Sequence, residues 1–396
     1  MKNRSFLASI LVAIASLVLF QAKIVAFFAA GQTVSQLFSL VKRYGNTITT
    51  ATATATATTT TTATTLSQQL DESPSLAIFQ KLDLPSNSTL TATTMSVSRA
   101  IRKVFLAIEQ AEGAGARVRR SVGTPQLRNF SPFLMLDHFS IKPGAGFPDH
   151  PHRGQETITY LLQGAVDHED FAGNRGTIES GDLQFMTAGR GIIHAEMPRQ
   201  NKDGSANVGL QLWVDLPREL KMCEPRYRDL RAKEIPQVEV DGGKVRVKVI
   251  SGQSHGVDSV KDLAYTPVWI LDVEIQPGGK ITQPLPEGWN SFGYVLEGSA
   301  LFGEKGSQTV VEQYHNVVFE SQGEVVRIEV DEGAEKSARL VLIAGMPLDQ
   351  KVVQYGPFVL NSQEEVYQAF MDYQTHSNGF ERAKGWQSEI GKSMVH

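Results

Sequence analysis

The sequence predicts an all-β protein built from two related domains. Short apolar runs that alternate like strands recur from about residue 96 onward, and glycine-centred turns separate them, as in β-sandwiches and barrels. A pattern in residues 154–164 returns in residues 288–298, which indicates a duplicated β-domain. A convincing helical period occurs in one short segment near the C-terminus. A chain of 396 residues is long enough for such an arrangement.

Composition excludes several classes of protein. The formal net charge is −4, and residues 1–94 carry six Lys/Arg against three Asp/Glu, so the remainder is acidic at −7. An acidic body argues against direct nucleic-acid binding, which needs a basic face. Cys223 is the one cysteine, which rules out intrachain disulfides and thiolate zinc sites. We interpret Cys223 as a small apolar residue.

Residues 1–95 form a leader of different composition. Residues 6–30 are apolar behind a basic start, and residues 46–65 are almost entirely Thr and Ala. This combination fits a signal anchor, a cleaved signal or an organelle transit peptide, and equally a disordered tether. Met95 lies directly before the first globular pattern, so a gene-model extension is a further interpretation. We expect membrane contact only through residues 6–30.

The first predicted domain covers residues 96–235. Residues 157–162 and 210–216 alternate as strands, whereas residues 100–110 fit either a strand or a short helix. The charged stretch 217–236 is predicted to be an irregular connection between domains.

The second domain covers residues 236–350, with strands predicted at 245–249, 325–330 and 340–344. The tail, residues 351–396, contains the predicted helix. Residues 362–365 form a capping box, and apolar residues follow at helical spacing. We expect this helix to end before Asn378-Gly379.

The metal-site prediction rests on two pairs of residues in the first domain. His150 with His152, and His194 with Glu196, are each spaced i, i+2, which places both side chains of a pair on one face of a strand. Three imidazoles and a carboxylate suit Fe(II), Mn(II), Ni(II), Co(II) or Zn(II). His138 and His168 are predicted to be supporting or surface residues, with His168 in a solvated acidic stretch.

The repeat predicts that this site is single. When residues 154–164 are aligned with 288–298, the four candidate ligands fall on residues that cannot bind a metal ion, namely Pro284, Pro286, Ile328 and Val330. The second domain should therefore keep the barrel without the metal.

Longer motifs identify a family. Residues 146–154 (GFPDHPHRG) and 187–198 (TAGRGIIHAEMP) resemble the pirin family of the cupin superfamily, as do 209–214, 288–289, 356–358 and 378–384. The resemblance covers roughly residues 97–390. It implies a bicupin of two β-sandwich or jelly-roll barrels, with iron bound only in the first by His150, His152, His194 and Glu196. Gln155 departs from the apolar aromatic residue that is usual in animal pirins, which puts substrate preference in doubt.

The resemblance also implies two functions. One is quercetin 2,3-dioxygenase activity on a flavonol and dioxygen, with Fe(II)/Fe(III) as cofactor and Glu196 as the base for the 3-hydroxyl proton. The other is a redox-sensitive cofactor role, with a transcription regulator of the NF-kappaB type or a G-protein alpha subunit as partner. A metal-free scaffold is a third alternative. The family implies a monomer in the nucleus and cytosol, whereas the leader favours a membrane, an organelle or secretion.

Overall fold

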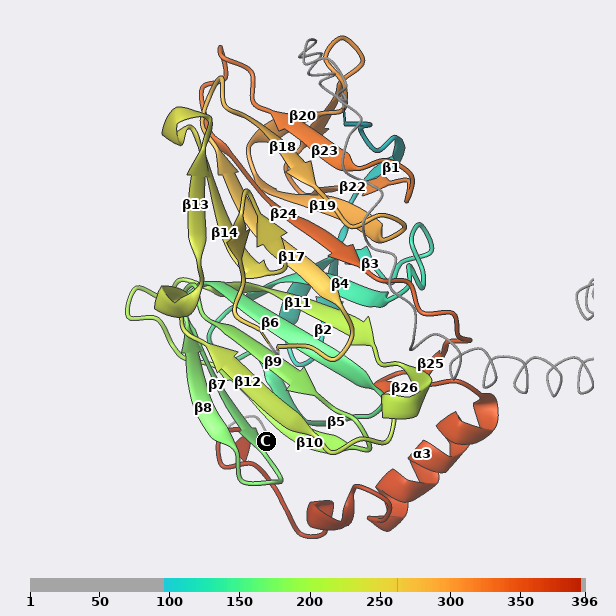
Figure 1. Ribbon diagram of the computed structural model, residues 1–396. Helices are drawn as coiled ribbons and strands as arrows, with labels where there is room; N and C mark the ends of the chain where they lie inside the picture. The colour runs from blue at the N-terminus through green and yellow to red at the C-terminus, as the bar shows by residue number, and fades with distance from the viewer. Residues whose placement is uncertain (1–95, 262, 393–396) are drawn as a thin grey trace, which may run out of the picture. The chain divides into compact units, whose positions relative to one another are not determined.

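The computed structural model describes residues 96–261 and 263–392 (Figure 1). The predicted apolar segment at 6–30 and the Thr/Ala segment at 46–65 lie outside these residues. The described chain is mostly β, as predicted, with α3 (Gln363–Thr375) as its α-helix. Within this part of the chain, no helix has the length and apolar character needed to cross a membrane.

The first barrel pairs a large sheet with a small one. The large sheet contains, in spatial order, β12 (Arg226–Leu230), β9 (Leu183–Thr187), β6 (Gln155–Gln163), β11 (Asn207–Asp215), β4 (Phe133–Ile141), β3 (Ala116–Val122) and β2 (Glu109–Glu112). The small sheet contains β5 (Phe147–His152), β10 (Ile192–Pro198), β7 (Ala165–Asp170) and β8 (Arg175–Glu179). Apolar side chains such as Phe139, Leu161 and Val166 pack between the two sheets, which closes the barrel.

The second barrel repeats this plan. Its large sheet contains β1 (Ile101–Leu106), β22 (His315–Phe319), β19 (Asn290–Glu297), β24 (Ala338–Gly345), β17 (Val268–Ile275), β14 (Val245–Ser251) and β13 (Gln237–Val240). Its small sheet contains β18 (Lys280–Pro284), β23 (Val325–Glu329), β20 (Ser299–Phe302) and β21 (Thr309–Glu312). Leu271, Phe302 and Ile328 belong to its apolar core. This is the bicupin architecture.

The strand orders support the predicted duplication. In each barrel the third strand of the large sheet, β6 or β19, carries the repeated Tyr and is followed by a turn glycine, Gly164 or Gly298, with φ of 86° and 68°. Both small sheets also share one order. The exception is β1, which comes from the N-terminal side of the first barrel yet pairs antiparallel with β22 at the edge of the second.

The two large sheets meet through a continuous apolar cluster. Leu136, Ile158 and Leu212 of the first sheet pack in one cluster with Phe292 and Val341 of the second. The shared interior fixes the two barrels against each other by apolar burial.

Two polar contacts cross this interface at equivalent positions of the repeat. Tyr160 donates a hydrogen bond to Asp272 at 2.7 Å, while the hydroxyl of Tyr294 lies 3.1 Å from Nδ1 of His138. His138 and Asp272 are themselves equivalent positions when residues 154–164 are aligned with 288–298. Each contact satisfies polar groups that the interface would otherwise bury unpaired.

The structure refines three local predictions. The ambiguous segment 100–110 is the strand β1 followed by the start of β2. The stretch 217–236 is not wholly irregular, because it contains β12 between two 3-10 turns, and β12 pairs with β9. In α3 the capping box is present, since Ser362 Oγ accepts from the backbone of Glu365 at 3.1 Å. The helix ends at Thr375, before the predicted stop.

Candidate metal centre

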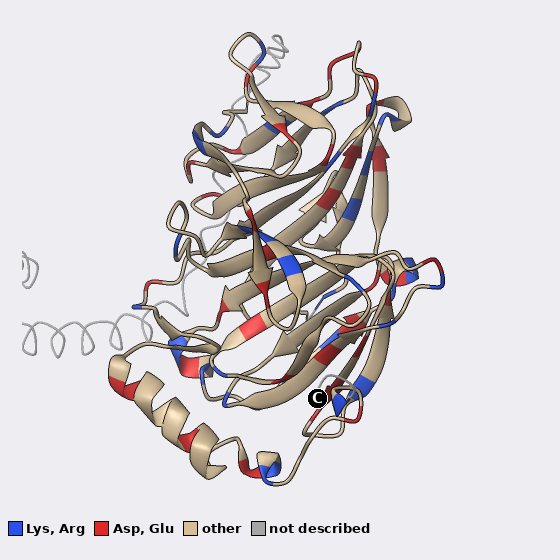
Figure 2. Ribbon diagram, turned by 180° about the vertical axis from the view of Figure 1, so that it is seen from behind, with Lys and Arg blue, Asp and Glu red and all other residues tan. Residues whose placement is uncertain are grey.

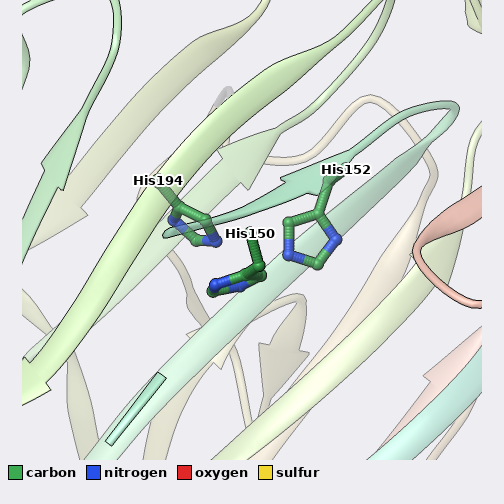
Figure 3. A group of neighbouring side chains, drawn as sticks. All are labelled: His150, His152 and His194. Atoms are coloured by element: carbon green, nitrogen blue, oxygen red, sulfur yellow. The ribbon is translucent and has the colours of Figure 1, made fainter. Parts of the chain in front are cut away.

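Three of the four predicted ligands lie together in the first barrel. His150 and His152 are on β5, His194 is on β10, and the two strands pair antiparallel with His194 opposite His150. The alternation of strand side chains therefore brings all three imidazoles to one face. One ligand atom from each lies within 4.8 Å of the others, and the ring centroids are 4.4–5.1 Å apart (Figure 3).

The turn after His152 holds this strand in place. Gly154 has φ of 80°, and a Cβ there would collide with the backbone oxygen of Val359. Glycine is therefore required for the close approach of β26 (Phe358–Leu360). Arg153, just before it, is almost fully buried and donates to the backbone oxygens of Arg190 and Asn378. The C-terminal segment thus packs against and supports the strand that carries His150 and His152.

A hydrogen bond determines which ring nitrogen of His150 is protonated. Its Nδ1 lies 2.8 Å from the carbonyl oxygen of Pro148. A carbonyl can only accept, so Nδ1 carries a proton, and in the neutral form of the ring Nε2 keeps the lone pair. This is the arrangement typical of a metal-binding imidazole.

His194 supplies the observation that best fits a bound metal ion. The side chain is 1% exposed, and neither ring nitrogen has a hydrogen-bond partner among the described residues. Buried polar atoms without a partner are rare, and a bound metal ion would satisfy them here. Burial, together with the nearby imidazoles, holds the pKa of His194 and that of His152 well below the usual range. Both rings are therefore neutral at pH 7, which is the form that binds metal.

The predicted fourth ligand, Glu196, is placed differently. Its carboxylate is not part of the three-histidine group. Gln211 Nε2 donates to its Oε2 at 3.1 Å, and the hydroxyl of Thr159 lies 3.3 Å from Oε1. Glu196 nevertheless lines the same cavity as His150 and His152. It is thus close enough to act on a molecule in that cavity, and its role as a ligand stays a prediction.

The cavity has a volume of about 860 Å³. It is lined by residues of the candidate metal site and by polar and apolar neighbours, namely Phe139, Phe147, His150, His152, Thr159, Val166, Glu196, Gln211 and Trp213. The lining also includes Arg120, Arg128, Asp137 and the segment 351–354, of which Arg128 and Lys351 are exposed. A space of this size holds a flat organic molecule with room to spare.

Sequence reasoning did not single out Thr159, Gln211 or Trp213. Thr159 and Gln211 face each other across β6 and β11, and the ring of Trp213 meets that of His152 edge-on at 5.0 Å. The only local signal was a polar residue inside a strand, and many strands carry such residues on their solvated face. The cross-strand pairing that turns them inward is not visible in one sequence.

The other two histidines of the first domain, His138 and His168, pack against aromatic residues outside the three-histidine group. His138 packs at the barrel interface, as a supporting residue. The prediction that His168 lies in a solvated stretch is wrong, because the residue is 6% exposed and stacks on Tyr227. His168 is opposite Glu196 in the pairing of β7 with β10, so the alternation of β7 turns it inward.

The three arginines on β3, which precedes the histidine motifs in sequence, do not form a basic patch because each is paired with a carboxylate. Arg117 and Arg119 pair with Glu109, and Arg120 pairs with Glu112 and Asp137. Acidic and basic residues are interspersed along the strands of both barrels (Figure 2). The three-histidine group is also single in the part of the chain that the structure describes.

Comparisons with known proteins agree with this fold. A family model described as Pirin matches residues 115–214, and one described as Pirin C-terminal cupin domain matches residues 270–379. A pirin-like protein from Solanum lycopersicum and pirin from Homo sapiens are each 48% identical over 298 residues. Those 298 residues are 75% of this chain, and they cover 99% and 100% of the two relatives.

Solved structures show the same likeness. The crystal structure of a quercetin 2,3-dioxygenase from Acinetobacter baumannii matches with a TM-score of 0.64 at 29% identity, over 70% of this chain and 98% of that one. The family models and the curated relatives together span both barrels and the metal centre. The chain therefore belongs to the pirin family.

Proposed function

We propose that this protein is an iron-dependent dioxygenase of the quercetin 2,3-dioxygenase type, acting on flavonols. The observation that carries the proposal is the three-histidine group, in which His152 and His194 are buried and two members line a cavity of about 860 Å³. The likeness to the quercetin 2,3-dioxygenase from Acinetobacter baumannii supports it. On this view, residues 96–235 are the metal-binding domain, residues 236–350 the metal-free domain, and residues 351–396 the supporting tail.

The donor set suits iron. Three imidazole ligands leave coordination positions open, and Fe(II) bound there would supply binding places for substrate oxygens and for dioxygen. Mn(II), Ni(II), Co(II) and Zn(II) suit the same donors. The donor set therefore does not single out iron, and the choice of iron belongs to the proposal.

The residues of the chain would then do three things. Glu196 takes the proton of the flavonol 3-hydroxyl onto a carboxylate oxygen, while Gln211 and Thr159 hold that carboxylate in place. The apolar walls at Phe139 and Trp213 contact the aromatic rings and exclude water. Incorporation of dioxygen, opening of the heterocyclic ring and release of carbon monoxide complete the reaction.

The test uses the full chain loaded with Fe(II). Quercetin absorbance is followed under air, and carbon monoxide is measured in parallel. We expect turnover that depends on iron, and a loss of at least about 100-fold in kcat for Glu196→Gln, the size expected for removal of a general base. Absence of turnover above that of metal-free protein would refute the proposal.

The remaining functional expectations stay predictions. These are the redox-sensitive role with a transcription regulator or G-protein alpha subunit as partner, the monomeric state, and the location in nucleus and cytosol.

A further inference from the structure

Gln155 is a buried polar residue at the metal centre. It is the first residue of β6, and its side chain is fully buried. The amide Nε2 atom lies 2.9 Å from Nδ1 of His152, and the amide oxygen has no hydrogen-bond partner among the described residues. Buried polar side chains normally form hydrogen bonds, and the contact of this amide is with a candidate metal ligand. We therefore ask how Gln155 affects His152.

The orientation of this amide decides which nitrogen of His152 carries the proton. If the amide nitrogen donates to Nδ1, the proton of the neutral ring sits on Nε2. If the amide is flipped so that its oxygen and nitrogen exchange places, the oxygen accepts from Nδ1–H and Nε2 keeps its lone pair. The oxygen and nitrogen of an amide have nearly the same shape, so both orientations fit the same space.

The geometry of the group distinguishes the two. Figure 3 shows one ring nitrogen of His152 facing His150 and His194, and the other turned away from them. The nitrogen turned away is Nδ1, because that atom contacts Gln155. Nε2 is then the atom offered to the centre, and it can bind a metal ion only if Nδ1 holds the proton.

The neighbouring ligand provides a parallel. His150, on the same strand, has its Nδ1 held by the carbonyl oxygen of Pro148. An oxygen acceptor behind Nδ1 would therefore serve both members of the His150–His152 pair. Such acceptors orient metal-binding imidazoles and raise their basicity.

We propose that Gln155 is a positioning residue that accepts the Nδ1–H of His152 through its amide oxygen and so presents Nε2 to the metal ion. This rests on the metal centre of the proposed function, not on the identity of the substrate. A more basic imidazole is also a stronger donor to a metal ion.

The first experiment determines which ring nitrogen of His152 carries the proton. Long-range ¹H–¹⁵N NMR of the metal-free full chain, with ¹⁵N-labelled histidine, reports which ring nitrogen of His152 is protonated. We expect Nδ1–H in the natural protein and in Gln155→Glu, since a carboxylate is an acceptor only. We expect Gln155→Leu to lose this single tautomer, while His150 keeps its own in every variant.

Metal affinity gives the second readout. In competition with a chelator, Fe(II) should bind Gln155→Leu about 10- to 100-fold more weakly than the natural protein, the usual effect of removing such a partner. Gln155→Glu should bind at least as tightly as the natural protein. Gln283→Leu is the matched control, because Gln283 is 1% exposed in the second barrel, away from the metal centre.

Two results would overturn the proposal. One is a His152 that carries its proton on Nε2 in the natural protein. The other is a Gln155→Leu variant that binds Fe(II) as tightly as Gln283→Leu. Neither measurement uses quercetin or dioxygen, so a protein that fails to turn over flavonols can still pass this test, and one that turns them over can still fail it.

Discussion

Replacing Arg153 by Met should weaken the contact between the C-terminal segment and the strand that carries His150 and His152. Arg153 directly follows His152 and is 2% exposed. Its guanidinium donates to Asp372 on α3 at 2.8 Å and to two backbone oxygens at 2.6 Å, and it lies 4.8 Å from the centre of the Phe380 ring. A single side chain thus joins β5 to α3 and to the turn after it.

The expected effect follows from burial. Removing one partner of a buried ion pair costs about 3–5 kcal/mol, because the other charge is left uncompensated. The two backbone oxygens also lose a charged donor, but these losses overlap, so we expect about 4 kcal/mol in the free energy of unfolding. Adding Asp372→Asn should recover part of it, since the uncompensated charge is then gone.

Urea unfolding of metal-free protein measures this, with hydrogen exchange of the α3 amides as a local probe. The matched control is Arg117→Met on β3, whose pairing with Glu109 joins two side chains that are 53% and 42% exposed. Such surface pairs contribute less than about 1 kcal/mol. The reasoning fails if Arg153→Met is no more destabilising than Arg117→Met, or if the changes at Arg153 and Asp372 add without any coupling.

Three further predictions concern the helix cap, pH and the cavity mouth. Ser362→Ala should cost about 1 kcal/mol of stability in thermal unfolding, because the capping hydrogen bond is lost, whereas Ser362→Asp should keep it. Burial, with the charges of nearby arginines, lowers the pKa of His138 to about 4. The unfolded chain, with a His pKa of about 6.5, therefore takes up a proton first, so stability should fall as pH drops from about 6.5 to about 4. A His138→Gln variant whose urea midpoints fall just as steeply would contradict this. Arg128 and Lys351 line the cavity mouth, and neither has a carboxylate within 4.0 Å in the described residues. Reversing both to Glu should weaken the binding of a quercetin sulfate ester about 5-fold more than that of quercetin, as fluorescence titration would report, and equal effects would count against it.

The metal centre was predictable because its signal is local. The i, i+2 spacing of His150 and His152 predicts that both side chains lie on one face of a strand, and the structure places His194 beside them. The same spacing selected Glu196, whose role as a ligand stays a prediction. Position 155 also stood out before the structure, as a departure from the animal pirins at the border of the site. What the sequence could not reveal was the contact between Gln155 and His152 Nδ1, which depends on how a tight turn folds back.

Other features depend on partners that are distant in sequence. The acidic neighbours of His168 suggested solvent, but pairing with β10 turns it into the barrel. The strand β12 was missed because its charged sequence shows no clear alternation, and pairing with β9 is what defines it. The partner of β1 is separated from it by about 210 positions, and no local pattern specifies such a pairing.

The placement of β1 has a consequence for how the protein is made. A ribosome produces β1 before any other described strand, but its partner β22 follows only after the whole first barrel has been synthesised. Domains usually fold in order as they emerge. Here the second barrel needs β1, which is synthesised first and has no strand partner until β22 has been made. A fragment carrying the second barrel alone would expose the edge of β22, which is a template for aggregation. We therefore expect the second barrel to complete its folding only when it is covalently linked to the segment that carries β1.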